Sequence, residues 1–139
     1  MPQKNSNSAG RSPNALRVAA VQLRSVDDLE GNLQKMESIL EQCAAKGVQI
    51  AAFPECAVTG YTTEAILRPT LRELRTIEKR LSEACRKNRI HALIGTPYRT
   101  GKHIYNAALI IDARGKLLAR QFKLHLVGQD TAWNCAPGS

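Results

Sequence analysis

A glutamate stands directly after an apolar segment of the chain, where it could act as an acid or a base. Glu55 follows Pro54 at the end of the segment 48–53, and Gly60 comes shortly after it. Because the proline stiffens the chain and the glycine can turn it sharply, the carboxylate could be held inward in a partly dry pocket. Glutamates at strand ends are also common as solvated loop residues, so the spacing alone leaves both interpretations open.

A lysine among apolar neighbours is the second candidate. Lys123 lies in the segment 120–126, where strand alternation would turn the apolar side chains to one face and the lysine to the other. The apolar residues are Phe122, Leu124 and Leu126, and His125 would share the face of the lysine. A fixed ammonium could stabilise negative charge that develops during a reaction. A single lysine in a basic chain is more often a solvated surface charge, and a histidine more often makes structural hydrogen bonds.

The segments before Glu55 have the pattern of a strand, a helix and a second strand. The apolar run from Leu16 to Leu23 has the length of a strand, and its continuity predicts a strand covered on both faces. An amphipathic helix follows, with Asp27 and Glu30 as its N-cap and third-position partner and Gly47 as its stop. The segment 48–53 is a second strand, so the short links predict a βαβ unit with parallel strands. The apolar residues of the helix are Leu29, Leu33, Met36, Leu40, Cys43 and Ala44.

A second amphipathic helix is predicted after Pro69. Thr70 and Glu73 form a capping-box pattern, and the helix should end near Asn88. We expect its apolar face, like that of the first helix, to pack against the sheet. This face is formed by Leu71, Leu74, Ile77, Leu81, Ala84 and Cys85.

The remaining strands come from three apolar segments. Ile90 to Gly95 is one strand, and the segments 105–111 and 116–120 flank a turn at 112–115. Gly115 can supply the positive φ that such a turn needs, so these two segments should form a hairpin. A βαβ unit followed by a hairpin indicates an α/β fold, with a mixed sheet and the two helices on one face.

Length and composition fit one modest domain. The chain has 139 residues, of which 43% are hydrophobic, and this is enough to bury a core. Residues 1–14 are polar and rich in Ser, Asn, Gly and Pro, so we expect a disordered tail before a domain at residues 15–139. No apolar run reaches the roughly 18 residues that span a bilayer, and we find no signal-peptide core, which favours a soluble cytoplasmic protein.

The cysteines and the charge narrow the classes of function. Cys43, Cys56, Cys85 and Cys135 lack CxxC spacing and are too few for a disulfide scaffold, so reduced thiols are expected. The net charge of +8 could attract nucleic acid, but the basic residues are scattered and aromatic residues make up only 4% of the chain. Because binding of single strands needs aromatic stacking platforms, nucleic acid is not the expected partner.

Four blocks along the chain form a specific combination. In order, they are Ala20–Leu23, Phe53–Tyr61, Tyr105–Ala108 with Asp112 and Gly115, and Lys123–Leu126. This combination resembles successive motifs of the nitrilase superfamily of carbon-nitrogen hydrolases, and the resemblance covers about residues 16–139. It implies one half of a nitrilase-like αββα sandwich. Members of the family bring two such sandwiches together through their helices, so the resemblance also implies a homo-oligomer for the full fold.

The resemblance implies a chemistry for the charged residues. In the family, a cysteine thiolate attacks an amide, nitrile or N-carbamoyl carbon, and water hydrolyses the resulting thioester. Glu55 matches the general base, Lys123 matches the lysine that stabilises the tetrahedral intermediate, and Asp130 is the nearest match to an auxiliary glutamate. The sequence departs from the family at Gln121 and Phe122, where tyrosine or arginine is common. No metal or organic cofactor is implied, because these groups and a thiol supply the chemistry themselves.

The nucleophile of the family lies beyond the Pro-Gly pair that closes this sequence at 137–138, so we expect no nucleophile in this chain and no activity of the chain alone. Cys43 and Cys85 fall on helix faces that should be buried, and Cys56 should point away from Glu55. Cys135 precedes the Pro-Gly pair and is either an inert loop thiol or a substitute nucleophile.

Two functions from different classes remain open. One is a carbon-nitrogen hydrolase of the amidase or nitrilase type, present as a truncated or split chain, which acts on a small amide, nitrile or N-carbamoyl substrate once a C-terminal half completes it. The other is a non-catalytic interaction or assembly module that kept the first half of the fold. In either case an incomplete half would expose apolar sheet surface and unpaired backbone groups.

Overall fold

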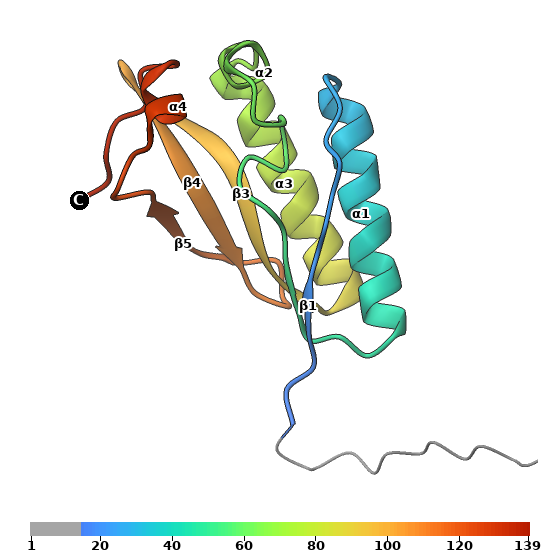
Figure 1. The fold of residues 1–139 in the computed structure, drawn as a ribbon. Helices are drawn as coiled ribbons and strands as arrows, with labels where there is room; N and C mark the ends of the chain where they lie inside the picture. Colours follow the sequence, from blue (N-terminus) through green and yellow to red (C-terminus); the bar gives the residue numbers. More distant parts are fainter. Residues whose placement is uncertain (1–14) are drawn as a thin grey trace, which may run out of the picture.

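The computed structural model describes residues 15–139, and these form a five-stranded sheet with helices packed on one face (Figure 1). The tail predicted at residues 1–14 lies outside the described residues. In their order across the sheet, the strands are β1 Val18–Ala20, β2 Ile50–Ala52, β3 His91–Thr100, β4 His103–Ile111 and β5 Leu117–Phe122. The helices are α1 Leu29–Ala45, α2 Thr63–Leu67, α3 Leu71–Asn88 and α4 Gly128–Thr131. No helix in this part of the chain is long and apolar enough to cross a membrane.

The sheet is mixed, as the sequence predicts. β1, β2 and β3 are parallel neighbours, whereas β4 and β5 each run antiparallel to the strand before them. α1 lies in the connection from β1 to β2, and α3 lies in the connection from β2 to β3, so these strands form successive βαβ units. The turn at 112–115 joins β4 to β5 with Gly115 at φ 78°, which confirms the predicted hairpin.

β3 extends further than the sequence indicates. The predicted strand ends at Gly95, but β3 continues to Thr100 and pairs with β4 across a turn that contains Gly101. The segment 96–100 has no apolar alternation and includes Pro97, which cannot donate to a ladder, so the pattern does not predict this part of the strand. The extended pairing sets Pro97 opposite Asn106 of β4.

The observed N-cap residue is the predicted one in α3 and lies one residue later than predicted in α1. α3 begins with the predicted capping box between Thr70 and Glu73. α1 is capped by Asp28, whose carboxylate accepts from the N–H groups of the following turn, and not by the predicted Asp27. Asp27 forms an ion pair with Arg68 instead. Either of two neighbouring aspartates can cap a helix. Here Asp27 is engaged by its ion pair with Arg68, and Asp28 forms the cap.

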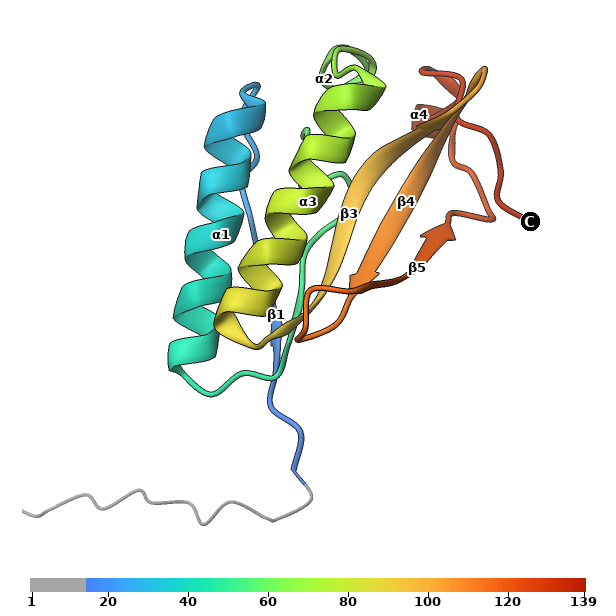
Figure 2. The ribbon, with the colours of Figure 1, turned by 180° about the vertical axis from the view of Figure 1, so that it is seen from behind.

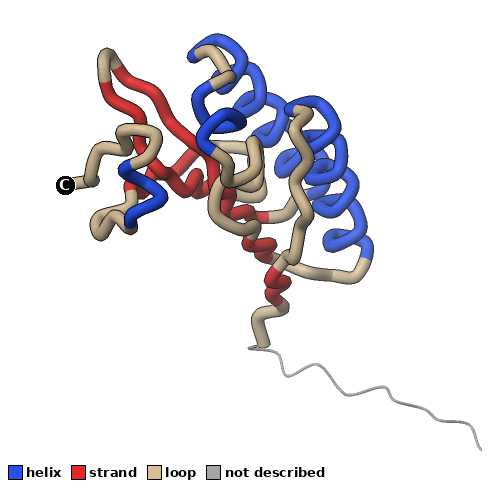
Figure 3. Tube along the Cα trace, turned by 45° about the horizontal axis from the view of Figure 1, so that its top comes forward, coloured by secondary structure: helices blue, strands red, loops and turns tan. Residues whose placement is uncertain are grey.

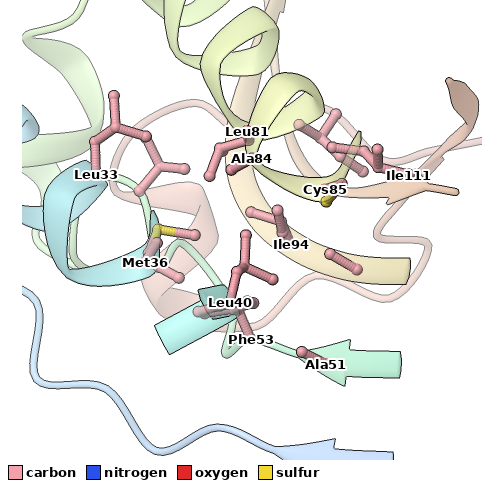
Figure 4. Close-up of a cluster of buried hydrophobic side chains, with 14 of the residues drawn as sticks. Leu33, Met36, Leu40, Ala51, Phe53, Leu81, Ala84, Cys85, Ile94 and Ile111 are labelled. Carbon is pink, nitrogen blue, oxygen red and sulfur yellow. The ribbon is translucent and has the colours of Figure 1, made fainter. Parts of the chain in front are cut away.

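The main core lies between the sheet and helices α1 and α3 (Figure 4). Ile94 of β3 and Ala51 of β2 supply its sheet side, and burial of each large apolar side chain there contributes about 1.5–3 kcal/mol. The central residues of both predicted helix faces are buried, and the ends of the faces are partly buried, which confirms their register. Their residues Leu33, Met36, Leu40, Leu74, Ile77 and Leu81 are each at most 8% exposed.

The opposite face of the sheet carries no helix of the described residues, as the two views in Figure 1 and Figure 2 show. Leu93 is 38% exposed on this open face, whereas its neighbours Ala92 and Ile94 are fully buried under the helices. Val18 of β1 is 62% exposed. The prediction that the first strand is covered on both faces is therefore wrong for this part of the chain, because α1 and α3 supply a layer on one side only.

Leu81→Ala should lower the free energy of unfolding by about 2–5 kcal/mol, because it removes a fully buried side chain and leaves a cavity between α3 and the sheet. Leu118→Ala is the matched control, since Leu118 is 55% exposed and its truncation should cost less than about 0.5 kcal/mol. Urea denaturation followed by circular dichroism measures both values. Equal losses in the two variants would contradict the assignment of the core.

Candidate active site

The loop that carries Glu55 lies against a glycine of the neighbouring strand. Phe53 donates its backbone N–H to Leu93 of β3, and Val58 donates to the carbonyl of Gly95. A Cβ atom at Gly95 would stand 2.2 Å from the carbonyl oxygen of Pro54, so a side chain at this position would push the loop away. The loop therefore reaches its place over the middle of β3 because residue 95 is glycine.

Lys123 meets Glu55 at the end of β5. Its backbone N–H donates to the carbonyl of Asn106 on β4 at 2.8 Å, which fixes the start of its side chain. Its Nζ lies 2.8 Å from Glu55 Oε1 and 2.9 Å from Asp130 Oδ2. The structure thus brings together all three residues that the sequence singles out.

The alternation predicted around Lys123 holds only in part. β5 ends at Phe122, so the chain leaves the strand before Leu124. Leu124 is 51% exposed and does not share a buried face with Phe122 and Leu126, which are partly buried. His125 is exposed. The lysine is oriented by its contacts with β4 and the carboxylates rather than by continued strand pairing.

Asp130 is the buried member of the group. Its side chain is fully inaccessible, and its carboxylate accepts hydrogen bonds from the Tyr61 hydroxyl at 2.6 Å and the Val127 N–H at 2.9 Å, as well as from Lys123 and, more weakly, Asn106. Burial by itself raises the pKa of Asp130, but these donors outweigh it and bring the pKa down to about 2. The carboxylate is therefore charged at neutral pH.

Asn106 and Tyr61 are site residues that sequence reasoning did not single out. The Nδ2 group of Asn106 donates to Glu55 Oε1 at 2.6 Å and to Asp130 Oδ1 at 3.3 Å. Both residues lie inside blocks that resemble family motifs, and an amide near the start of the apolar segment 105–111 was the available signal. Burial and the hydrogen bond to Asp130 raise the pKa of Tyr61, so its hydroxyl keeps its proton and remains a donor.

Lys123 has an ammonium N–H, and Glu55 a carboxylate oxygen, that the hydrogen bonds within the site leave available for a reacting molecule. The hydrogen bonds to Glu55 and Asp130 raise the pKa of Lys123, so its ammonium stays charged. An ammonium has three N–H donors, and these two carboxylates use two of them. Glu55 receives its hydrogen bonds through Oε1, and none of the described residues bonds Oε2. One N–H and one carboxylate oxygen are therefore available.

Glu55 and Lys123 both line a groove of about 390 Å³ on the open face of the sheet. The side chains of Glu55, Asn106, Gln121 and Lys123 supply its polar lining, and small residues such as Ala52 and Ala108 lie along it. Among residues 15–139, no cluster of three or more His, Cys, Asp or Glu side chains could hold a metal ion. The arrangement can accept a proton and bind a negatively charged oxygen, which are tasks of acyl-transfer chemistry.

A second buried cluster adjoins these residues and contains two thiols. It consists of Cys56, Ile66, Trp133 and Cys135. The C-terminal segment reaches it by pairing with β4, since Ala136 donates to the carbonyl of Ile104, and Figure 3 shows α4 and the chain end beside the β3–β4 hairpin.

Neither thiol of this cluster is activated. Burial, and next the charge of Glu55, raise the pKa of Cys56 to about 12. Burial likewise raises the pKa of Cys135, which is 8% exposed. Because the thiolate is the nucleophilic form, both cysteines have the properties of structural thiols in this arrangement.

Gly95→Ala should destabilise the fold by about 1–3 kcal/mol and displace the Glu55 loop, because the added methyl group overlaps the backbone of residues 54–56. Gly128→Ala is the control, since a Cβ atom there meets nothing within 4 Å. Denaturation gives the stabilities, and amide NMR shifts of Glu55 and Lys123 report the displacement. Unchanged shifts in Gly95→Ala would show that the loop does not depend on this contact.

Acid should destabilise the wild-type chain more than Asp130→Asn. The folded pKa of Asp130 is about 2 and lies below the ordinary 3.8, so the unfolded chain binds its proton first as the pH falls. The stabilisation from this carboxylate is complete above about pH 4 and is lost toward pH 2, an effect of about 2 kcal/mol. Urea unfolding between pH 5 and pH 2 measures the difference. Parallel curves for both proteins would refute the assignment.

Comparison with known proteins shows the family. The family described as carbon-nitrogen hydrolase matches residues 17–138. A nitrilase homolog 2 from Dictyostelium discoideum is 30% identical over 118 residues, and an aliphatic nitrilase from Rhodococcus rhodochrous is 31% identical over 127 residues. These alignments cover 82% and 80% of this chain but 36% and 35% of the relatives. The chain therefore spans about a third of the length of these relatives.

Solved structures agree on the fold. A cysteine-to-serine mutant of an amidase from Nesterenkonia, of the nitrilase superfamily, matches with a TM-score of 0.84 at 22% identity and covers 91% of this chain and 50% of the amidase. A double mutant of the Nesterenkonia amidase in complex with acrylamide gives a TM-score of 0.84 at 21% identity, covering 94% of this chain and 52% of the amidase. The predicted α/β architecture with half of the superfamily's fold is thus confirmed. Because the family match spans nearly all of the described residues, this chain belongs to the carbon-nitrogen hydrolase family.

Proposed function

We propose that this chain supplies the general base and the oxyanion-stabilising lysine of a cysteine-dependent hydrolase that cleaves the C–N bond of small amides or nitriles. The observation that carries the proposal is the contact of Lys123 Nζ with Glu55 Oε1 and Asp130 Oδ2, which leaves one ammonium N–H and Glu55 Oε2 free beside the same groove. A base and an oxyanion donor must reach the same reacting carbon, and the position of Glu55 and Lys123 in the lining of one groove supports these roles.

For an amide, the proposed reaction begins when Glu55 Oε2 takes the proton of a thiol. The thiolate attacks the carbonyl carbon, and the free N–H of Lys123 stabilises the negative oxygen of the tetrahedral intermediate. The protonated Glu55 then gives its proton to the leaving nitrogen, ammonia departs, and a thioester remains. Glu55 next takes a proton from water as the water attacks the thioester, and it returns this proton to the departing sulfur, which releases the acid and the thiol.

The thiol itself has to come from a segment that covers the open face of the sheet. Cys56 and Cys135 are buried thiols with raised pKa values, so we do not assign the role to either. The groove and the exposed Leu93 lie on the open face, where a second layer would enclose the free atoms of Glu55 and Lys123. In our proposal the chain without such a segment is inactive.

The comparisons support this choice of reaction. One relative is named an aliphatic nitrilase, and the Nesterenkonia amidase has a structure in complex with acrylamide and another with an acetamide moiety bound at its active-site cysteine. We therefore propose an amide or nitrile substrate, with N-carbamoyl compounds as a third possibility to test. Assembly into a homo-oligomer and a cytoplasmic location, which suits four free thiols, are part of the same proposal.

A non-catalytic assembly module is the second candidate, because the exposed apolar residues of the open face also suit a partner protein. Val18 and Leu93 would be covered by a partner in such a module just as they would be by the rest of an enzyme. The two candidates differ in whether Glu55 and Lys123 take part in turnover.

The purified chain alone should release no ammonia from short amides, nitriles or N-carbamoyl amino acids, because no activated thiol reaches the groove. Adding a segment that carries the cysteine of a related amidase should restore turnover, and Lys123→Met should then lower kcat by about 100-fold or more. Ammonia release and intact mass are the measurements. Glu55→Gln and Cys135→Ala are the companion variants.

Two results would contradict the proposal. Acylation of Cys135 in the chain alone, absent in Cys135→Ala, would make that thiol the nucleophile. Turnover in the completed protein that Glu55→Gln and Lys123→Met leave unchanged would remove both residues from the reaction, and binding without turnover would favour the module.

A further inference from the structure

Asn106 forms a hydrogen bond with each of the three charged residues of the site. Its backbone carbonyl accepts from the N–H of Lys123 at 2.8 Å, and its side-chain Nδ2 donates to Glu55 Oε1 at 2.6 Å and to Asp130 Oδ1 at 3.3 Å. The side chain is 4% exposed, so little solvent competes for these donors. A single residue of β4 thus holds the backbone of the lysine and the side chains of both carboxylates.

The orientation of this amide follows from its surroundings. With Nδ2 toward the carboxylates, both of its hydrogens meet negatively charged oxygens, whereas the flipped amide would turn its oxygen toward them. On the other side, the Sγ of Cys56 lies 3.8 Å from Oδ1 and can donate weakly to it. The adjacent buried thiol therefore has a structural role that agrees with its raised pKa.

The amide opposes a repulsion that is built into the site. Glu55 and Asp130 are two like charges bound to one ammonium, and their mutual repulsion favours separation or protonation of one of them. A neutral donor that bonds both carboxylates keeps them together without adding charge. Since both Nδ2 hydrogens are used, Asn106 has no donor left for a substrate.

We propose that Asn106 is a positioning residue that, by donating to Glu55 Oε1 and Asp130 Oδ1, holds both carboxylates on Lys123 and leaves Glu55 Oε2 and the third N–H of Lys123 free for a reacting molecule. The role in catalysis rests on the function proposed above, but the positioning itself can be measured in the chain without turnover. Asn106→Asp is the most informative variant, because it keeps the shape of the side chain, removes both donors and adds a third carboxylate.

Carboxyl 13C NMR of Asp130 tests the proposal in the full chain. With a pKa of about 2, about a tenth of Asp130 should carry a proton at pH 3. Asn106→Ala should raise this fraction to about half, which corresponds to a shift of about one pH unit, and Asn106→Asp should raise it further. Asn32→Ala is the matched control, since Asn32 is equally buried and bonds only the backbone of Val26 and Val58. It should leave the fraction unchanged.

Wild-type protein provides a measurement that does not depend on whether the variants fold. Both Nδ2 protons of Asn106 should resonate downfield and move as the two carboxylates are titrated. The proposal would be overturned if the chemical shifts of the Nδ2 protons did not change during this titration. It would also be overturned if the protonated fraction of Asp130 were unchanged in a folded Asn106 variant. In the completed enzyme, Asn106→Ala should lower kcat more than it changes KM. If the completed wild-type enzyme shows no turnover, the proposed function is refuted, while the NMR result for Asn106 stands.

Discussion

The sharing of one ammonium by two carboxylates is the interaction on which the rest of the site depends. Asp130 is fully buried, and a buried carboxylate without partners would take up a proton. Its donors come from four places in the chain: the loop before α2, β4, the end of β5 and the turn into α4. All four must reach their positions for the charge to persist, so the electrostatics of the site and the folding of this end of the sheet are coupled.

The two faces of the sheet have different roles: the face under the helices contributes to stability, and the open face carries the groove. Along β3, Ala92 and Ile94 point into the core beneath the helices, while Leu93 and Gly95 belong to the open face with the groove. The two-residue period of a strand makes this division possible within a few residues. Changes under the helices therefore act through packing, whereas changes on the open face act on the approach of a reacting molecule.

The sequence predicts most of the helices and strands but only part of the site. Glu55 and Lys123 follow segments with a strong strand pattern, so the neighbouring sequence is enough to predict that they lie near the ends of strands. The role of Asn106 depends on long-range pairing of β4 with β3 and β5, and that pairing includes the segment around Pro97, which carries no strand pattern. Likewise, α4 is a single short turn, held by the hydrogen bond that the N–H of Val127 donates to the Asp130 carboxylate. Its sequence has no periodic pattern that would predict a helix.

Trp133 gives this site a built-in optical signal. It is the one tryptophan of the chain, it is 1% exposed, and it follows Asp130 closely enough to move with the same turn. An indole in dry surroundings emits at shorter wavelength than one in water, and the neighbouring thiols of Cys56 and Cys135 can quench that emission. Intrinsic fluorescence of the unlabelled protein therefore reports whether the segment that carries Asp130 is docked against the Glu55 loop.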